Sequence, residues 1–130
     1  MNWKVILQLS LLGLLVGILS IFGIVNQTIE LIVWLIIGVF SGYVIHKKMN
    51  KLIFTHSVIT GLFMGILSSV IQSVFFNTYL KNNPSSLDGL KNIPAAMEPQ
   101  YILLFSGPFL GIIFGVIIGL IAIAFNKFSK

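Results

Sequence analysis

Four long runs of apolar residues, separated by short polar segments, make up most of the chain. They cover about residues 5–25, 29–46, 52–78 and 100–125. A hydrocarbon core of about 30 Å needs roughly 20 helical residues, so each run is close to the length of a membrane span. The first run is too long for the apolar core of a cleaved signal peptide, and we expect it to be retained. The pattern predicts an all-α integral membrane four-helix bundle, with residues 1–130 forming a single transmembrane domain.

The sizeable loop between the third and fourth runs, residues 79–99, has a different composition, rich in proline and asparagine. We expect it on the outer side of the membrane. Prolines bracket its centre, and apolar residues recur there at every third position: Leu87, Leu90 and Ile93. This spacing predicts a short amphipathic helix near residues 85–93, lying on the membrane surface or folded over the mouth of the bundle.

Small residues recur at intervals of four in every run. They are Gly13 and Gly17 in the first run, Gly38 and Gly42 in the second, Gly61, Gly65 and Ser69 in the third, and Gly107, Gly111, Gly115 and Gly119 in the fourth. On a helix this interval forms a nearly bare stripe, which lets two backbones approach closely in lipid. The pattern predicts a glycine zipper between helices of one chain. The alternative is that one stripe, in the fourth run, faces another subunit.

Pro108 lies inside the fourth run. Because proline has no N–H and its ring clashes with the carbonyl four residues earlier, we expect a helix kink there. The carbonyl that loses its partner belongs to Leu104. We expect Ser106 and Gly107 to relieve the strain on this part of the backbone.

A segment of the first run recurs in the third. Residues 13–20 and 61–68 are identical at six of eight positions. One interpretation is a duplicated helical hairpin, with the two copies related by a pseudo-twofold axis along the membrane normal. The other is a chance match among few residue types.

Composition excludes a water-soluble domain. The chain is 57% hydrophobic and 8% charged, with a mean hydropathy of +1.04, whereas soluble domains carry about 25% charged residues. Cysteine is absent, which removes disulfides and thiolate metal sites. A formal charge of +5 would suggest nucleic acid in a soluble protein, but the lysines here flank apolar runs. We therefore expect membrane lipid, and no nucleic acid, as the partner.

The lysines predict the orientation in the membrane. Six of the eight belong to the termini and the second connection: Lys4, Lys47, Lys48, Lys51, Lys127 and Lys130. The outer side would hold Lys81 and Lys91 with all three acids, Glu30, Asp88 and Glu98. Lysine is enriched in cytoplasmic segments, so both termini are expected in the cytoplasm.

No catalytic or cofactor motif stands out. His46 and His56 could form part of a metal site or proton relay, but we favour interfacial anchoring because no carboxylate is expected on their side. We expect no acid or lysine inside any span, which argues against a proton-coupled pump. The outer acids form no recognisable acid–base pair, so the sequence predicts no enzyme, no metal and no cofactor.

Three polar residues within the third run are candidates for function: Gln72, Thr60 and Ser73. They could form interhelical hydrogen bonds or line a polar path. The first interpretation fits a non-enzymatic membrane protein that self-associates or binds a partner. The second fits a small transporter or channel-like protein working as an oligomer. A hydrated cavity lined by these groups would favour transport.

Three segments carry a family resemblance. They are the start Met-Asn-Trp-Lys-x-Ile-Leu-x-Leu-Ser, the segment 75–84 (Phe-Phe-Asn-Thr-Tyr-Leu-Lys-Asn-Asn-Pro) and the glycine-rich segment 106–120. Together they resemble an uncharacterised family of small four-helix bacterial inner-membrane proteins. The resemblance implies this topology and a bacterial inner membrane, and it implies no activity.

Overall fold

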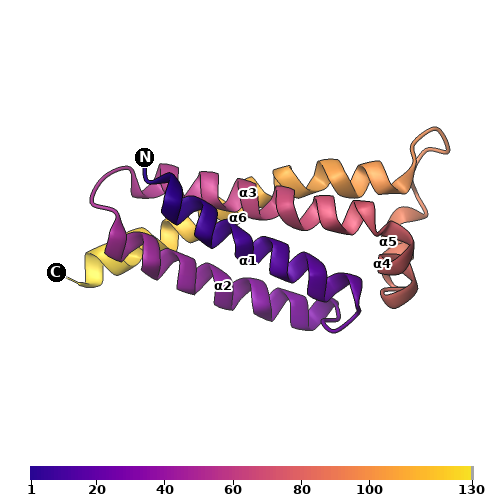
Figure 1. Cartoon of the computed structure of the whole chain (residues 1–130), viewed down its shortest axis with the longest axis horizontal. Helices are drawn as coiled ribbons and strands as arrows, with labels where there is room; N and C mark the ends of the chain where they lie inside the picture. Colours follow the sequence, from indigo (N-terminus) through magenta and orange to yellow (C-terminus); the bar gives the residue numbers. More distant parts are fainter. Residues whose placement is uncertain (130) are drawn as a thin grey trace.

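The computed structural model describes residues 1–129, which form helices and no strand. Four helices are long and apolar enough to cross a membrane: α1 (Trp3–Ile21), α2 (Gln27–Lys48), α3 (Ile53–Val74) and α6 (Pro99–Phe128). Two short helices, α4 (Phe76–Asn82) and α5 (Ser86–Leu90), lie between α3 and α6 in the chain (Figure 1). The prediction of an all-α chain with four apolar helices, typical of a multi-pass membrane protein, is confirmed.

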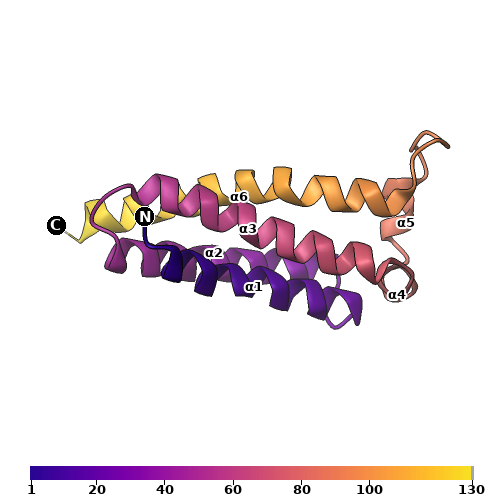
Figure 2. The ribbon, with the colours of Figure 1, turned by 45° about the horizontal axis from the view of Figure 1, so that its top comes forward.

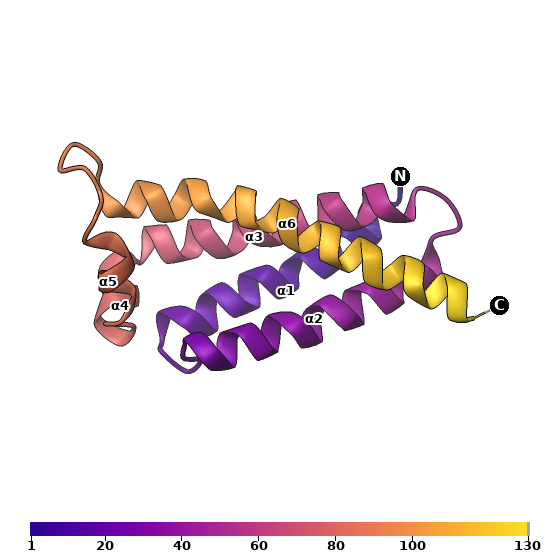
Figure 3. The same cartoon turned by 180° about the vertical axis from the view of Figure 1, so that it is seen from behind.

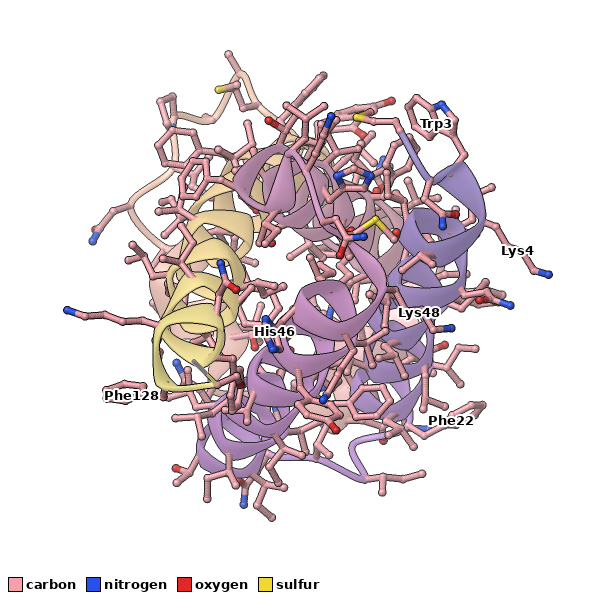
Figure 4. All side chains as sticks on the ribbon, turned by 90° about the vertical axis from the view of Figure 1, so that its left-hand side faces the viewer. Trp3, Lys4, Phe22, His46, Lys48 and Phe128 are labelled. Carbon is pink, nitrogen blue, oxygen red and sulfur yellow. The ribbon has the colours of Figure 1, made fainter. Side chains whose placement is uncertain are left out.

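The two ends of the molecule differ in what they carry. Both termini and the α2–α3 connection lie at one end, here called the terminus end (Figure 1). The α1–α2 turn, α4 and α5 lie at the opposite end, here called the loop end. A view onto the terminus end shows the side chain of Lys4 pointing away from the helices (Figure 4), and Lys48 is also exposed. The lysine-rich segments of the sequence therefore share one end.

The long helices pack unequally on one another. α3 lies between α1 and α6 and contacts both (Figure 2). α6 also contacts α2, whereas α1 and α2 make few contacts. The sequence repeat matches Gly13 with Gly61, but these two glycines make different contacts. Gly13 faces α3, whereas Gly61 faces α6.

Local polar groups set where the second long helix begins. The Asn26 side chain accepts a hydrogen bond from the Ile29 N–H at 2.9 Å, so Asn26 is the N-cap of α2. Glu30 consequently falls in the first turn, where a carboxylate is favourable. His46, Lys47 and Lys48 occupy the last turn, where cations are favourable.

The third apolar run is not one helix. The sequence predicts a span over residues 52–78, but α3 ends at Val74 and the chain breaks at Phe75. The side chains of Asn82 and Asn83, at the end of α4, donate to carbonyls at the end of α1. The last carbonyls of a helix have no partner within it, so these bonds satisfy the end of α1 and attach α4 to it.

Those bonds join the loop end to the first helix. Asn82 Nδ2 donates to the Ile21 carbonyl at 2.8 Å, and Asn83 Nδ2 donates to the Ser20 carbonyl at 2.7 Å. Gly23, just after α1, has a φ of +66° and lies close to Asn82. A side chain at this position would be strained both by its backbone angle and by its neighbour. The helix expected near residues 85–93 is shorter than predicted, because α5 covers Ser86–Leu90.

Candidate functional site: a small-residue seam beside a mostly apolar cavity

Small residues let α3 and α6 touch backbone to backbone, along a contact that we call the seam. A Cβ atom added to Gly61 would collide with the backbone of Gly115, and one added to Gly65 would collide with the Gly107 carbonyl. A Cβ atom on Gly111 would lie 2.5 Å from the Gly61 carbonyl oxygen. Real Cβ atoms do not approach backbone this closely, so only glycine fits these positions without moving a helix.

The other predicted small residues also face neighbouring helices of the same chain. A Cβ atom on Gly13 would meet the Met64 backbone, and one on Gly17 would lie 3.1 Å from the Cα of Ser68. On α2 the nearest neighbours are side chains: the Phe114 ring lies 3.3 Å from a Cβ on Gly38, and Ile121 lies 2.8 Å from one on Gly42, which also has the Ala122 backbone nitrogen at 3.3 Å. In the fourth run, Gly119 lies against the Phe54 ring of α3. Because its neighbours belong to α3, the fourth-run stripe is occupied within the chain.

A serine of α3 satisfies the carbonyl that the proline of α6 leaves free. α6 continues as one helix through Pro108. The Ser69 hydroxyl shares its single proton between two carbonyls, that of Ile66 in its own helix at 3.1 Å and that of Leu104 in α6 at 3.3 Å. We expected Ser106 to relieve this strain, but its hydroxyl donates to Leu103 instead. The partner comes from the neighbouring helix because glycine packing brings the Ser69 side chain within reach.

A second serine repeats this contact one turn further along. The Ser73 hydroxyl donates to the Gln100 carbonyl of α6 at 3.1 Å. Ser69 and Ser73 lie four residues apart on α3, and their acceptors lie four residues apart on α6. Ser73, a candidate for a polar path, is therefore engaged in interhelical hydrogen bonding.

Beside the seam, α2, α3 and α6 line an open cavity of about 440 Å³. It lies in the half of the molecule toward the loop end, where α2 and α6 diverge (Figure 3). Its walls are mostly apolar and include Leu31, Trp34, Leu110 and Phe114; its polar groups include Gln27, Glu30, Ser69 and Gln72. A small number of polar groups in an apolar pocket is typical of small-molecule sites.

Glu30 is the acidic group of the cavity wall and is only half-buried. Its carboxylate accepts hydrogen bonds from the Trp34 indole N–H and the Ser20 hydroxyl, both at 3.4 Å. Within residues 1–129, no lysine or histidine nitrogen lies within 4.0 Å of this carboxylate. The expectation that no acid falls inside a span is wrong. Since α2 begins at Gln27, Glu30 is part of a spanning helix.

The sequence analysis missed the pairing of Glu30 with Trp34. Residues four apart on a helix lie on the same face, so the spacing was a usable signal. No sequence pattern indicated the neighbour on α1, Ser20, which lies across the α1–α2 turn. These contacts hold the carboxylate at the cavity rather than in the polar turn.

The predicted polar path is not continuous. Gln72 is buried and lines the cavity, as does Ser69. Thr60 is fully buried elsewhere, and its hydroxyl has no hydrogen-bond partner in the part of the chain that the structure describes. The cavity wall on α3 starts at Gly65 and extends toward the loop end, so the cavity occupies one half of the molecule.

Both histidines make contacts that hold parts of the chain together. His56 is buried; its Nε2 accepts from the Asn2 N–H at 2.9 Å, and its Nδ1 lies 2.8 Å from the Leu52 carbonyl. This arrangement requires the proton on Nδ1 and uses both nitrogens, so His56 joins the N-terminus to the start of α3. His46 lies in the last turn of α2, and its ring, labelled in Figure 4, stacks on Phe125 with centroids 6.3 Å apart.

Comparisons of the chain with protein-family models, with curated proteins and with solved structures found no match.

Proposed function

We propose that this chain is a non-enzymatic integral membrane protein, a close-packed four-helix bundle that binds small, mostly apolar molecules in the cavity at its loop end. The observation that carries the proposal is the cavity itself. Its volume of about 440 Å³ falls within the range of roughly 300–1,000 Å³ that is typical of ligand pockets. The seam beside it supports the proposal, because a rigid wall keeps a site preformed.

The chemistry of the cavity wall supports binding rather than catalysis. Glu30 is the only titratable side chain among its lining residues within 1–129. General acid–base catalysis needs a partner for such a group, and nucleophilic catalysis needs an activated nucleophile beside a base. A lone carboxylate with neutral hydrogen-bond donors instead suits recognition of a ligand.

We also propose a bacterial inner membrane, with both termini in the cytoplasm. The support is the lysine-rich terminus end, together with the resemblance to small bacterial inner-membrane proteins. With this orientation the cavity lies in the outer half of the membrane. A reporter fused after Lys130 should be active in the cytoplasm; a reporter accessible from outside the cell would contradict the orientation.

A transporter that works as an oligomer is the second candidate. It is favoured by the presence of Gln72, Ser69 and Glu30 in one cavity. Because the cavity occupies half the molecule, transport would need a second conformation or a second chain to complete the path. Purified protein in liposomes should then release a trapped ligand, whereas a binding protein should hold the ligand without releasing it across the membrane.

Self-association and a duplicated hairpin are proposals that rest on the sequence. The apolar outer faces of α2 and α6 are available to lipid or to a second copy, with Leu35 66% and Phe109 67% exposed. Cross-linking in membranes at two protein densities tests association. Superposing α1–α2 on α3–α6 tests duplication, and a poor backbone match would contradict it.

Binding can be tested through the tryptophan in the cavity wall. The chain has two tryptophans, so Trp3→Phe leaves Trp34 as the sole tryptophan, which can be excited apart from the tyrosines. Three probes share a phenylbutyl body and differ in charge: 4-phenylbutanol, 4-phenylbutanoate and 4-phenylbutylamine. We expect at least one to change Trp34 fluorescence saturably in nanodiscs.

The matched variants distinguish the cavity from the surrounding lipid. Leu110→Trp places a larger side chain at the mouth of the cavity and should obstruct it; the emission of the added tryptophan is measured in ligand-free protein and subtracted. Ile113→Trp places the same ring on an exposed part of α6 outside the wall. Saturable binding that Leu110→Trp abolishes and Ile113→Trp preserves supports the proposal. Its absence for all three probes would overturn the cavity as a binding site.

A further inference from the structure

We propose that the cavity recognises an ammonium group carried on an apolar body, with Glu30 as the charged contact. This inference rests on the proposed function of the cavity and names the chemical class of its ligand. The first observation is that the Glu30 carboxylate has no cationic partner. Its protein partners are two neutral donors at 3.4 Å, and none of the lysines in the described part of the chain forms an ion pair with it.

A carboxylate in a membrane-spanning helix is costly unless a cation or several hydrogen bonds satisfy it. The two bonds that Glu30 accepts are long and leave acceptor positions on both oxygens unused. Neither lysine of the loop end supplies a cation to the cavity. Lys91 pairs with Asp88, and Lys81 is not among the residues that line the cavity. A ligand cation would supply the missing charge, whereas a ligand anion would meet repulsion.

Aromatic groups beside the carboxylate also favour a cation. Trp34 and Phe114 line the cavity and meet edge to face, with ring centroids 4.9 Å apart. The indole N–H of Trp34 donates to Glu30, so the indole ring and the carboxylate lie side by side in the cavity wall. A cation within about 6 Å of an aromatic face is attracted by the ring electrons. The carboxylate and the indole thus lie together on α2.

The remaining wall fits an apolar body. Leu31 and Leu110 line opposite sides of the cavity, on α2 and α6, and are 67% and 59% exposed. Residues that both line a cavity and remain exposed mark its mouth. In a membrane this mouth faces acyl chains, so a ligand that partitions into the bilayer has direct access. Gln27, which is exposed at the start of α2, extends the lining to the polar end of the helix.

Two sources share this chemistry: a free amphipathic amine and the ethanolamine headgroup of a phospholipid. Both combine an ammonium group with an apolar portion. The experiment uses 4-phenylbutylamine as the probe and 4-phenylbutanol as its neutral counterpart. Trp34 fluorescence is measured in the Trp3→Phe protein, in nanodiscs of phosphatidylglycerol with or without phosphatidylethanolamine.

Glu30→Gln removes the charge and keeps an oxygen that can accept from Trp34 and Ser20. Glu98→Gln is the matched control, because Glu98 is an exposed acid of the same loop end that does not line the cavity. We expect Glu30→Gln to weaken binding of the amine at least tenfold and to leave binding of the alcohol within about twofold. Glu98→Gln should leave both unchanged.

The outcomes separate this inference from the proposed function. Equal binding of amine and alcohol, unaffected by Glu30→Gln, would overturn the inference and leave the cavity as a small-molecule site. No saturable response to either probe would overturn both. Weaker amine binding in nanodiscs that contain phosphatidylethanolamine would identify the lipid headgroup as the ligand. Unchanged binding there would identify a free amine.

Discussion

α6 meets its two neighbours in two different ways. Against α3 it presents glycines, and the backbones touch with serine hydroxyls bonded across the contact. Against α2 it presents Phe114, whose ring packs on Trp34 and would lie 3.3 Å from a Cβ atom added to Gly38. Small residues bring two backbones together and leave no space, whereas large side chains hold two backbones apart. The cavity lies toward the loop end, beyond the point where the side-chain contact between α2 and α6 ends.

The largest expected effect comes from adding a methyl group to the seam. In Gly65→Ala the new atom would collide with the Gly107 carbonyl and lie 2.7 Å from the Cα of Gly111. Backbone cannot move aside without moving a whole helix, so we expect a loss of about 3 kcal/mol in the free energy of unfolding. Denaturation by SDS in mixed micelles measures this change.

Two other glycines provide matched controls for that substitution. In Gly38→Ala the methyl would meet a phenylalanine ring, which can rotate, and we expect a loss of about 1 kcal/mol. In Gly89→Ala nothing lies within 4 Å, and we expect a change of about 0.5 kcal/mol or less. Equal losses for Gly65→Ala and Gly38→Ala would mean that the two contacts of α6 do not differ.

A smaller effect is expected from removing the hydroxyl that replaces the missing bond at Pro108. Ser69→Ala should leave the Leu104 carbonyl unsatisfied and cost about 1.5 kcal/mol. In a Pro108→Ala background the alanine N–H can reach this carbonyl within the helix. The cost of Ser69→Ala should then fall to about 0.5 kcal/mol.

Ser73→Ala is the internal control for this cycle. The Gln100 carbonyl keeps the N–H of Leu104 as a partner within α6, so losing Ser73 should cost about 0.5 kcal/mol in either background. If Ser69→Ala costs the same with and without Pro108, the serine is not compensating for the proline.

A further effect, smaller than those of Gly65→Ala and Ser69→Ala, should be local to the loop end. Asn83→Ala removes the amide that bonds the Ser20 carbonyl at 2.7 Å, and should weaken the attachment of α4 to α1 by about 1 kcal/mol. Hydrogen exchange in α4 should become faster, while exchange along the seam should be unchanged. Asn92→Ala, at an exposed loop position, should alter neither. Faster exchange along α3 and α6 in Asn83→Ala would show that the attachment supports the whole molecule.

The sequence predicted those features that depend on repeated residue types. Four apolar runs indicated the long helices, and glycines at intervals of four pointed to the positions where α3 and α6 now touch. The lysine-rich segments were correctly expected to share one end. These features are readable because every residue of a run or stripe contributes to the same signal.

The features that sequence analysis missed depend on single contacts between distant residues. The break at Phe75 is accompanied by bonds from asparagine amides to the end of α1. The bond from Ser69 to Leu104 depends on how closely glycine lets the helices approach. The position of Glu30 in a cavity wall depends on where α2 and α6 diverge, and no local pattern encodes that divergence.

Thiol labelling tests most directly whether an open cavity lies beside a closed seam. The chain has no cysteine, so single replacements report one site each. Gln72→Cys lies in the cavity wall, Thr60→Cys lies in the fully buried part of α3, and Asn92→Cys is the exposed reference. A thiol must ionise to react, which requires water. We predict that N-ethylmaleimide labels Gln72→Cys in membranes and leaves Thr60→Cys unlabelled. Equal labelling of the two, or protection of both, would contradict the distinction.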